Sequence, residues 1–155
     1  MQAIRDAFRE YMVDRCKSKN RRVRCVFCPS PGANFLILDC DRIMARRGLQ
    51  GVINDCIVIE RHGILHVAVV ELKGGSYSPG HTRSQLVAGA ALVMDILDEL
   101  KIRAEPCIHL VVVAPRHPYS QRDLLCSDVP RVRGKKMKIH TVRCGARFSQ
   151  VISRA

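Results

Sequence analysis

The chain has 155 residues, of which 47% are hydrophobic and 26% charged, a composition typical of one globular domain spanning 1–155. Its apolar runs are too short for a membrane span, and the N-terminus lacks the basic and then apolar pattern of a secretory signal. We therefore expect neither an integral membrane protein nor a secreted one. The 26 Lys and Arg residues outnumber the 14 Asp and Glu residues, and the net charge of +12 favours a polyanionic partner, most often nucleic acid.

The first part of the chain is expected to contain one helix and two short strands. Ile4, Phe8 and Met12 recur at helical spacing and predict an amphipathic helix over residues 1–16. Short strands are expected at 25–28 and 34–40, and they are followed by a loop or helical turn over 42–49.

The middle of the chain predicts a β-hairpin. Val52–Glu60 and Ile64–Lys73 are rich in β-branched residues, and Arg61-His62-Gly63 separates them. Apolar residues occupy both faces of each strand, so we expect the hairpin to lie inside a sheet. The elements expected after it are a loop at 74–80, a helix at 82–100, a strand at 108–114, a short helix at 118–127 and a strand at 138–144. This order predicts an α/β fold with a mixed central β-sheet flanked by helices.

The positive charge is concentrated in two blocks that contain no acidic residue. The first spans 15–24 and includes Arg21, Arg22 and Arg24, and the second spans 131–138 and includes Lys135 and Lys136. Such blocks are typical of surfaces that bind a phosphate backbone.

Eight cysteines leave three interpretations: disulfides, a zinc site or reduced thiols. Cys25 and Cys28 have the spacing of half a zinc site, but no second pair of that spacing follows. Without a secretion signal, disulfides lose most of their support. We therefore expect reduced thiols and a cytoplasmic protein.

Three charged residues interrupt the apolar hairpin: Asp55 in its first strand, and Glu71 and Lys73 in its second. Side chains two residues apart share one face of a strand, so Glu71 and Lys73 point the same way. Asp55 lies opposite Glu71 if Arg61 faces Leu65, and opposite Val69 if Glu60 faces Ile64. A two-residue turn would place Asp55 on the other face. Two of these three registers gather all three charges in one cluster.

Burying charges is costly unless they are paired or bind a metal. One interpretation is a buried salt-bridge cluster in which Lys73 neutralises one carboxylate. That arrangement leaves one negative charge over, and a divalent cation would neutralise it. Carboxylate oxygens and water suit Mg²⁺ or Mn²⁺ better than Zn²⁺. A metal and a lysine beside a water molecule are what phosphodiester hydrolysis requires.

Asn54-Asp55, followed after a hairpin interval by Glu71-Leu72-Lys73, resembles the signature of the PD-(D/E)xK nuclease superfamily. Asn54 stands where that motif often has proline. The resemblance implies a restriction-endonuclease-like core, α-β-β-β-α-β, and a Mg²⁺-dependent (endo)nuclease. By the same resemblance Asp55, Glu71 and the carbonyl of Leu72 would bind the metal, and Lys73 would position the attacking water. It also favours DNA over RNA.

Some members of that superfamily carry a glutamine in the helix that follows the lysine strand, and Gln85 matches this position. Gln85 also fits a capping box with Thr82 at the start of the helix. Related nucleases sometimes add a metal ligand from the first helix, where Glu10 and Asp14 stand. Periodicity favours a solvated surface position for Glu10, and Asp14 lies nearer the apolar stripe.

Several residues near the hairpin are candidates for contact with nucleic acid. Tyr77 could stack on a base, and His81 and Arg83 could contact phosphates. His66 and His109 lie in expected strands and are interpreted as core or hydrogen-bonded histidines. The competing functional interpretation is a catalytically unused nuclease-fold module that acts as a basic nucleic-acid-binding or complex-building subunit. In either case we expect a homodimer or a partner protein to supply specificity.

Overall fold

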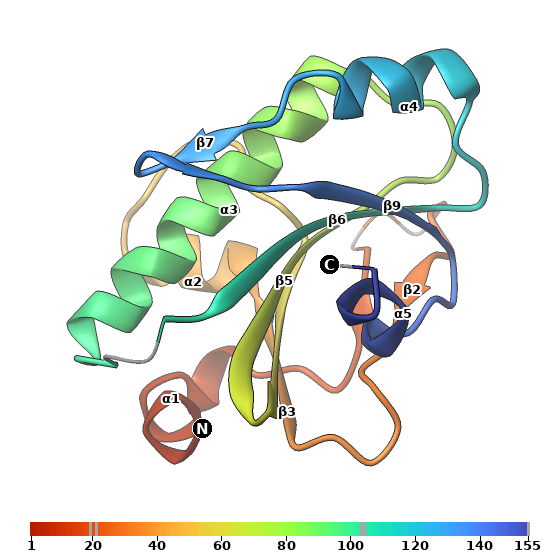
Figure 1. Ribbon diagram of the computed structural model, residues 1–155. Helices are drawn as coiled ribbons and strands as arrows, with labels where there is room; N and C mark the ends of the chain where they lie inside the picture. Colours follow the sequence, from red (N-terminus) through yellow and green to blue (C-terminus); the bar gives the residue numbers. More distant parts are fainter. Residues whose placement is uncertain (19, 21, 103–104, 155) are drawn as a thin grey trace.

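The computed structural model describes residues 1–18, 20, 22–102 and 105–154. Its centre is a five-stranded sheet with the strand order β3-β4-β5-β6-β9 (Figure 1). The strands are β3 (Phe35–Asp39), β4 (Cys56–His62), β5 (Ile64–Leu72), β6 (Cys107–Ala114) and β9 (Ile139–Arg143). The pairs β3–β4 and β4–β5 are antiparallel, whereas β5–β6 and β6–β9 are parallel. The predicted α/β fold with a mixed sheet flanked by helices is confirmed.

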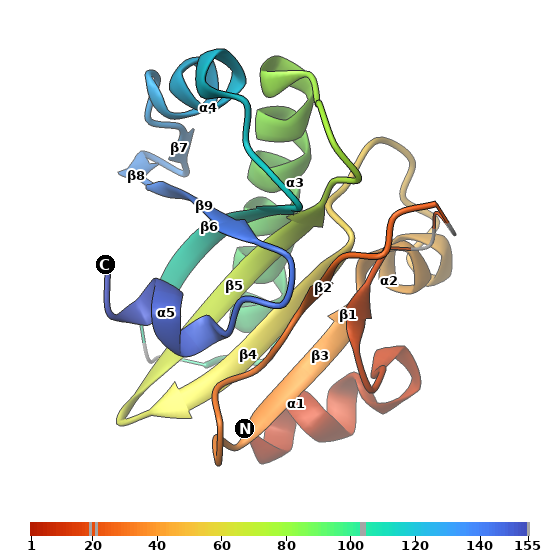
Figure 2. The same cartoon turned by 90° about the vertical axis from the view of Figure 1, so that its right-hand side faces the viewer.

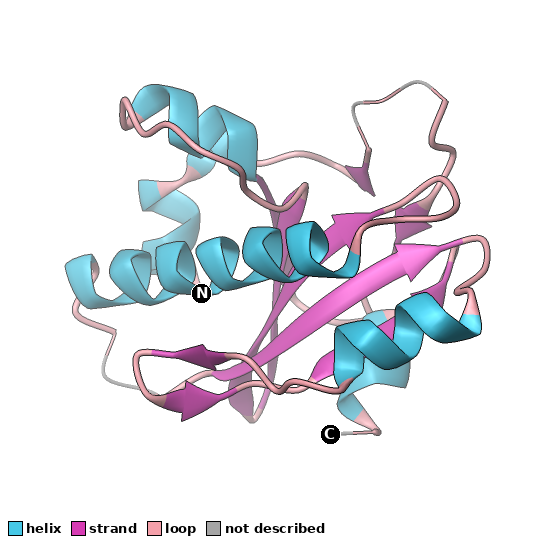
Figure 3. Cartoon of the chain, turned by 90° about the horizontal axis from the view of Figure 1, so that it is seen from above, coloured by secondary structure: helices cyan, strands magenta, loops and turns pink. Residues whose placement is uncertain are grey.

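Helices cover both faces of this sheet (Figures 1 and 2). One face carries α3 (Pro79–Glu99), which is the longest helix in the view of Figure 3, together with α1 (Gln2–Ala7) and α2 (Cys40–Arg46). The other face carries α5 (Phe148–Ile152) and a small sheet of β1 (Cys16–Lys17) and β2 (Val26–Phe27). The remaining elements are η1 (Arg9–Tyr11), α4 (Tyr119–Cys126), β7 (Arg131–Val132) and β8 (Lys135–Lys136). Within the described ranges, no helix is long and apolar enough to cross a membrane.

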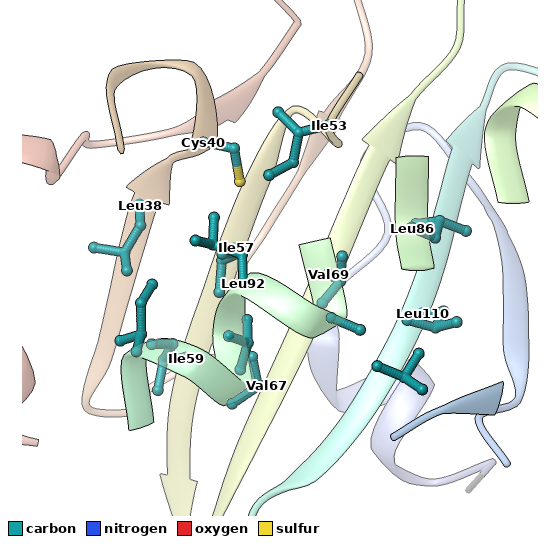
Figure 4. Packing of buried hydrophobic residues seen from close by; sticks show 14 of the residues in the cluster. Leu38, Cys40, Ile53, Ile57, Ile59, Val67, Val69, Leu86, Leu92 and Leu110 are labelled. Carbon is teal, nitrogen blue, oxygen red and sulfur yellow. The ribbon is translucent and has the colours of Figure 1, made fainter. Parts of the chain in front are cut away.

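Alternate residues of the central strands build two separate hydrophobic clusters. Ile57, Val69 and Leu110 face α3, as Figure 4 shows. Val58 and Val70 point to the opposite face and pack in the cluster that includes Phe148 of α5. Since both faces are buried, the strands read as continuous apolar runs in the sequence. A charged side chain in this region is therefore exceptional.

The turn of the β4–β5 hairpin determines which side chains face each other. Gly63 occupies the tip with φ of +74°, a left-handed conformation that glycine adopts without strain. Arg61 pairs with Leu65, and the same register pairs Cys56 with Val70. One step further along, Asp55 faces Glu71. This register is the one of the three considered in which the two carboxylates are directly opposed.

Three boundaries differ from the sequence-based expectation. The first helix ends at Ala7 and not near residue 16, because the chain turns extended and Val13 donates a hydrogen bond to Ile37 of the edge strand β3 at 3.0 Å. The first hairpin strand begins at Cys56, so Val52 is exposed in a loop. Helix α3 begins at Pro79 with Ser78 as its N-cap, and the capping box predicted between Thr82 and Gln85 is wrong.

The cysteine prediction also needs correction. The structure contains two disulfides, Cys16–Cys56 and Cys25–Cys144, which join residues 40 and 119 positions apart in the sequence. Cys28, Cys40, Cys107 and Cys126 are free. The expectation of uniformly reduced thiols therefore does not hold. Such long-range pairings depend on the fold, which brings β1 onto β4 and β2 close to the end of β9.

Candidate active site

Asp55 and Glu71 lie opposite each other where β4 begins and β5 ends. The amide of Leu72 donates to Oδ2 of Asp55 at 2.7 Å, which holds this carboxylate against the end of β5. The N–H and C=O of one residue point to the same side of an extended strand, so the Leu72 carbonyl faces the side on which Asp55 lies. Two carboxylates and one carbonyl oxygen are therefore gathered at one end of the hairpin.

Lys73, which directly follows β5, and Gln85 of α3 complete this cluster. The Lys73 ammonium donates to Glu71 Oε1 at 2.5 Å and to Gln85 Oε1 at 2.8 Å. Gln85 in turn donates from Nε2 to the carbonyl of Ile53 at 3.3 Å, which fixes the orientation of its amide. Gln85 thus links the lysine to the loop that precedes Asp55, and it does so from the second turn of α3.

Glu71 has a strongly perturbed carboxyl group. Its side chain is only 6% exposed, and burial, reinforced by the negative charge of Asp55, raises its pKa to about 7. Lys73 opposes this rise without cancelling it. Glu71 Oε2 is buried and accepts no hydrogen bond from any residue that the structure describes. A buried carboxylate oxygen without a partner is costly, so a proton or a cation at this atom would stabilise the folded protein.

Asn54 occupies the position where the motif often has proline, and it holds the backbone in a different way. Its Nδ2 donates to the carbonyl oxygens of Cys56 at 2.7 Å and Val70 at 3.3 Å, which joins the two strands beside Asp55. Gly89 of α3 permits this arrangement: a Cβ at that position would lie 1.9 Å from Asn54 Oδ1. The close approach of α3 to the hairpin therefore depends on this glycine.

Asp55 also lines an open cavity of about 680 Å³. Asp14, Arg15 and Lys17 lie along one side of it, and Asp39 and Arg42 lie along another. Glu71 and Lys73 are not among the lining residues, so Asp55 is the residue that joins the cavity to the buried cluster. Cys56 lines the cavity too, and its disulfide to Cys16 ties the Arg15–Lys17 segment to the start of β4.

Three further acidic residues lie in or near this part of the fold, and two of them, Asp14 and Asp39, line the cavity. Asp14 lies outside any helix, yet the chain carries it to the cavity of Asp55. Glu10 has a 61% exposed side chain 4.0 Å from Arg46, which fits the surface position expected for it. Asp39 was missed entirely. It caps α2 by accepting from the amide of Arg42 at 3.2 Å, and its only sequence signal is an acidic residue at the end of an apolar strand.

The first basic block contributes two cations to the cavity lining, Arg15 and Lys17. Arg22 and Arg24 are exposed in the segment between β1 and β2. Arg21 lies outside the described residues. Arg42, which the sequence did not single out, adds a third positive charge to the lining and forms an ion pair with Asp39 at 3.5 Å.

Tyr77 and Arg83, two of the three residues near the hairpin that were predicted to contact nucleic acid, are used within the fold. Tyr77 is only 7% exposed, and its hydroxyl lies 3.0 Å from His117 Nδ1, so it offers no open face for base stacking. Arg83 donates to the carbonyl of Leu124 and anchors α3 to α4. His81 alone among these three is exposed, in the first turn of α3.

The second basic block lies apart from the hairpin carboxylates. Lys135 and Lys136 form β8, and Lys135 is paired with Glu105. Their neighbour Arg133 pairs with Asp95 and Asp98 near the end of α3. Asp98 lies 13 residues beyond Gln85 on that helix, or about 20 Å along its axis. This block is partly neutralised and would contact only a substrate that extends well beyond the carboxylates.

The donor atoms of the hairpin fit a hard divalent cation. Asp55 and Glu71 supply carboxylate oxygens, and the Leu72 carbonyl faces the same side. Mg²⁺ and Mn²⁺ prefer such oxygen ligands and keep several waters, for which the open cavity beside Asp55 has room. The unpartnered Glu71 Oε2 is the observation that most directly favours a bound ion. Comparison of the chain with protein-family models, curated proteins and solved structures found no match.

Proposed function

We propose that this protein is a Mg²⁺-dependent nuclease of the PD-(D/E)xK kind, which hydrolyses phosphodiester bonds and acts on DNA in preference to RNA. The buried, unpartnered Glu71 Oε2 beside the charge of Asp55 carries the proposal, because a cation at this point would provide the partner that this oxygen lacks. The preference for DNA rests on the family resemblance alone.

In this proposal Asp55, Glu71 and the Leu72 carbonyl hold Mg²⁺ or Mn²⁺. A bound ion supplies Lewis acidity and lowers the pKa of a water molecule. Asp55 is oriented for this role by the Leu72 amide, and it presents its carboxylate at the cavity through which a phosphate could approach.

Lys73 positions the attacking water or the scissile phosphate. An ammonium has three N–H donors, and Glu71 and Gln85 account for two of them. The third can donate to a phosphate oxygen or to the water. Gln85 acts through Lys73 and is therefore a positioning residue, since its amide is held by the Ile53 carbonyl.

Positive charge around the cavity would hold the phosphate backbone. Arg15, Lys17 and Arg42 line it, and Arg22 and Arg24 are exposed on the same N-terminal segment as the first two. Contacts of this kind bind nucleic acid without reading its sequence. A second copy of the chain or a partner protein would then supply specificity.

The direct test is cleavage of supercoiled plasmid, linear duplex, single-stranded DNA and RNA with Mg²⁺, Mn²⁺ or EDTA. The variants are Asp55→Asn and Lys73→Ala, and Glu10→Gln is the matched control, because Glu10 is an exposed carboxylate outside the cavity. We expect metal-dependent cleavage that falls by at least about 100-fold in the first two variants and is unchanged in the control.

Equal cleavage by all variants would attribute the activity to a contaminant and overturn the proposal. Tight, salt-sensitive DNA binding without any cleavage would instead favour the catalytically unused binding module.

A further inference from the structure

A second group of metal-ligating side chains lies on the α5 face of the sheet, opposite to the face of Glu71. His66 of β5 is the direct partner of Cys107 in the parallel β5–β6 register. His109 lies two residues after Cys107 and therefore points to the same face. These three residues, the His66–Cys107–His109 cluster, come from two neighbouring strands whose geometry the sheet fixes.

The donor atoms of this cluster lie close enough together for one ion to bind to all three side chains. One ligand atom from each side chain lies within 4.8 Å of the others. His66 Nδ1 is 3.2 Å from His109 Nε2. With Zn–N bonds of about 2.0 to 2.1 Å, two nitrogens of a tetrahedral site lie about 3.3 Å apart. The separation of the two imidazole nitrogens therefore already matches one edge of a zinc coordination sphere.

The surroundings hold these side chains in place and leave one approach open. His109 is 2% exposed, and the edge of its ring packs against Phe148 of α5 at 5.5 Å between centroids. The neighbouring ring of His140 lies 5.6 Å away. Cys107 is only partly buried, which gives an ion access to the cluster.

A hydrogen bond between the two imidazoles is the simplest alternative. It accounts for one nitrogen of each ring, but it gives no reason for the thiol of Cys107 beside them. Two imidazoles and a thiol form a nitrogen and sulfur donor set, which Mg²⁺ disfavours and Zn²⁺ accepts.

We propose that His66, Cys107 and His109 form a binding site for Zn²⁺, with water in the fourth position. This site is independent of the nuclease proposal. His66 precedes Glu71 by five residues on β5, or about 17 Å along the strand, and the two side chains point to opposite faces.

The test uses full-length protein that has been treated with chelator while both disulfides remain intact. Co²⁺, a spectroscopic substitute for Zn²⁺, is titrated first, and Zn²⁺ or Mg²⁺ is then added in competition. We expect one equivalent of Co²⁺ to bind with a thiolate-to-cobalt charge-transfer band, which Zn²⁺ removes and Mg²⁺ leaves intact.

Cys107→Ser and His66→Asn should each weaken Zn²⁺ binding by at least about 10-fold, and Cys107→Ser should also abolish the charge-transfer band. Cys126→Ser is the matched control, because Cys126 is a free and exposed thiol elsewhere. Asp55→Asn, which alters the other site, should bind Zn²⁺ as the wild type does. Circular dichroism checks that each variant is folded.

Absence of stoichiometric binding would overturn the zinc site. So would binding without a thiolate band, or equal affinity in the wild type and folded Cys107→Ser.

Discussion

The two ends of β5 differ in the chemistry that they present. At its carboxyl end, Glu71 and the facing Asp55 supply hard oxygen donors and more negative charge than Lys73 neutralises. Near its amino end, His66 joins Cys107 and His109 in a set of nitrogen and sulfur donors. One strand, with side chains of alternating direction, thus carries the residues of the two proposed sites on opposite faces, and the two donor sets would select different cations.

Burial acts on both sites in the same physical sense but shifts their pKa values in opposite directions. It penalises the charged form, which is the carboxylate of Glu71 and the imidazolium of His109. At the carboxylate site, a bound cation would replace the proton of Glu71 and stabilise its charged form. The imidazole of His109 is favoured in its neutral form, so an ion at the histidine site would displace the thiol proton of Cys107 and not an imidazolium proton.

The largest expected effect on stability comes from replacing Lys73, which lies at the carboxylate end of β5 and not at the histidine end. Lys73→Met leaves Glu71 buried without its ion-pair partner, and we expect a loss of about 3 to 5 kcal/mol in unfolding free energy near neutral pH. The double variant Glu71→Gln/Lys73→Met should recover most of this loss. Urea unfolding measures both. An equal loss in the single and double variants would show that Lys73 contributes packing and not charge.

The Cys16–Cys56 disulfide, which lies next to Asp55 at the carboxylate end, should contribute to the unfolding free energy. Its removal in the Cys16→Ser/Cys56→Ser variant is expected to cost about 2 to 4 kcal/mol, because the unfolded chain regains the freedom of a 40-residue loop. Urea unfolding with and without a reductant provides the measurement. If the reductant leaves wild-type stability unchanged, the thiols are reduced in solution, contrary to the structure.

The pH dependence of stability should have opposite signs at the two ends. The pKa of Glu71 rises from 4.5 to about 7, so its contribution is fully present below pH 4.5 and is lost as pH rises through 7. The pKa of His109 falls from 6.5 to about 4, so its contribution is present above pH 6.5 and is lost as pH falls through 4. Each shift corresponds to at most about 3 kcal/mol.

Metal-free Glu71→Gln and His109→Gln variants would resolve these two contributions. As pH rises from 4.5 to 7, Glu71→Gln should gain stability relative to the wild type, and as pH rises from 4 to 6.5, His109→Gln should lose stability relative to the wild type. Parallel curves for the wild type and both variants would contradict this assignment.

The smallest effect concerns the packing of α3 on the hairpin. Gly89→Ala would bring a methyl group 1.9 Å from Asn54 Oδ1 and 2.6 Å from Val69 Cγ1, and relieving this clash should cost about 1 to 3 kcal/mol. Gly80→Ala in the same helix meets open space and serves as the control. Thermal unfolding compares the two. Equal melting temperatures would mean that α3 can move away from the hairpin.

The carboxylate site was predictable from the sequence because its signal is local. Asp55, Glu71 and Lys73 are charges within two apolar runs, and strand periodicity alone places Glu71 and Lys73 on one face. The pairing register of the hairpin could not be predicted from the sequence, because Arg61-His62-Gly63 is compatible with three different pairings of the two strands.

The histidine site was not predictable, because it depends on a non-local register. His66 and His109 look like core histidines until the parallel pairing of β5 with β6 brings Cys107 beside His66. The position of Asp39 in the cavity and the disulfide between Cys25 and Cys144 could not be predicted for the same reason. The predicted end of the first helix was wrong for a different reason. Met12 has helical spacing, but the edge strand β3 provides the backbone there with another hydrogen-bonding partner.

The most direct test of the central claim is the anomalous diffraction signal of crystals grown with Mn²⁺. The account predicts a peak within coordination distance of the carboxylates of Asp55 and Glu71 and of the Leu72 carbonyl. A Mn²⁺-saturated crystal with no peak there, and with Glu71 bound only to Lys73, would contradict it.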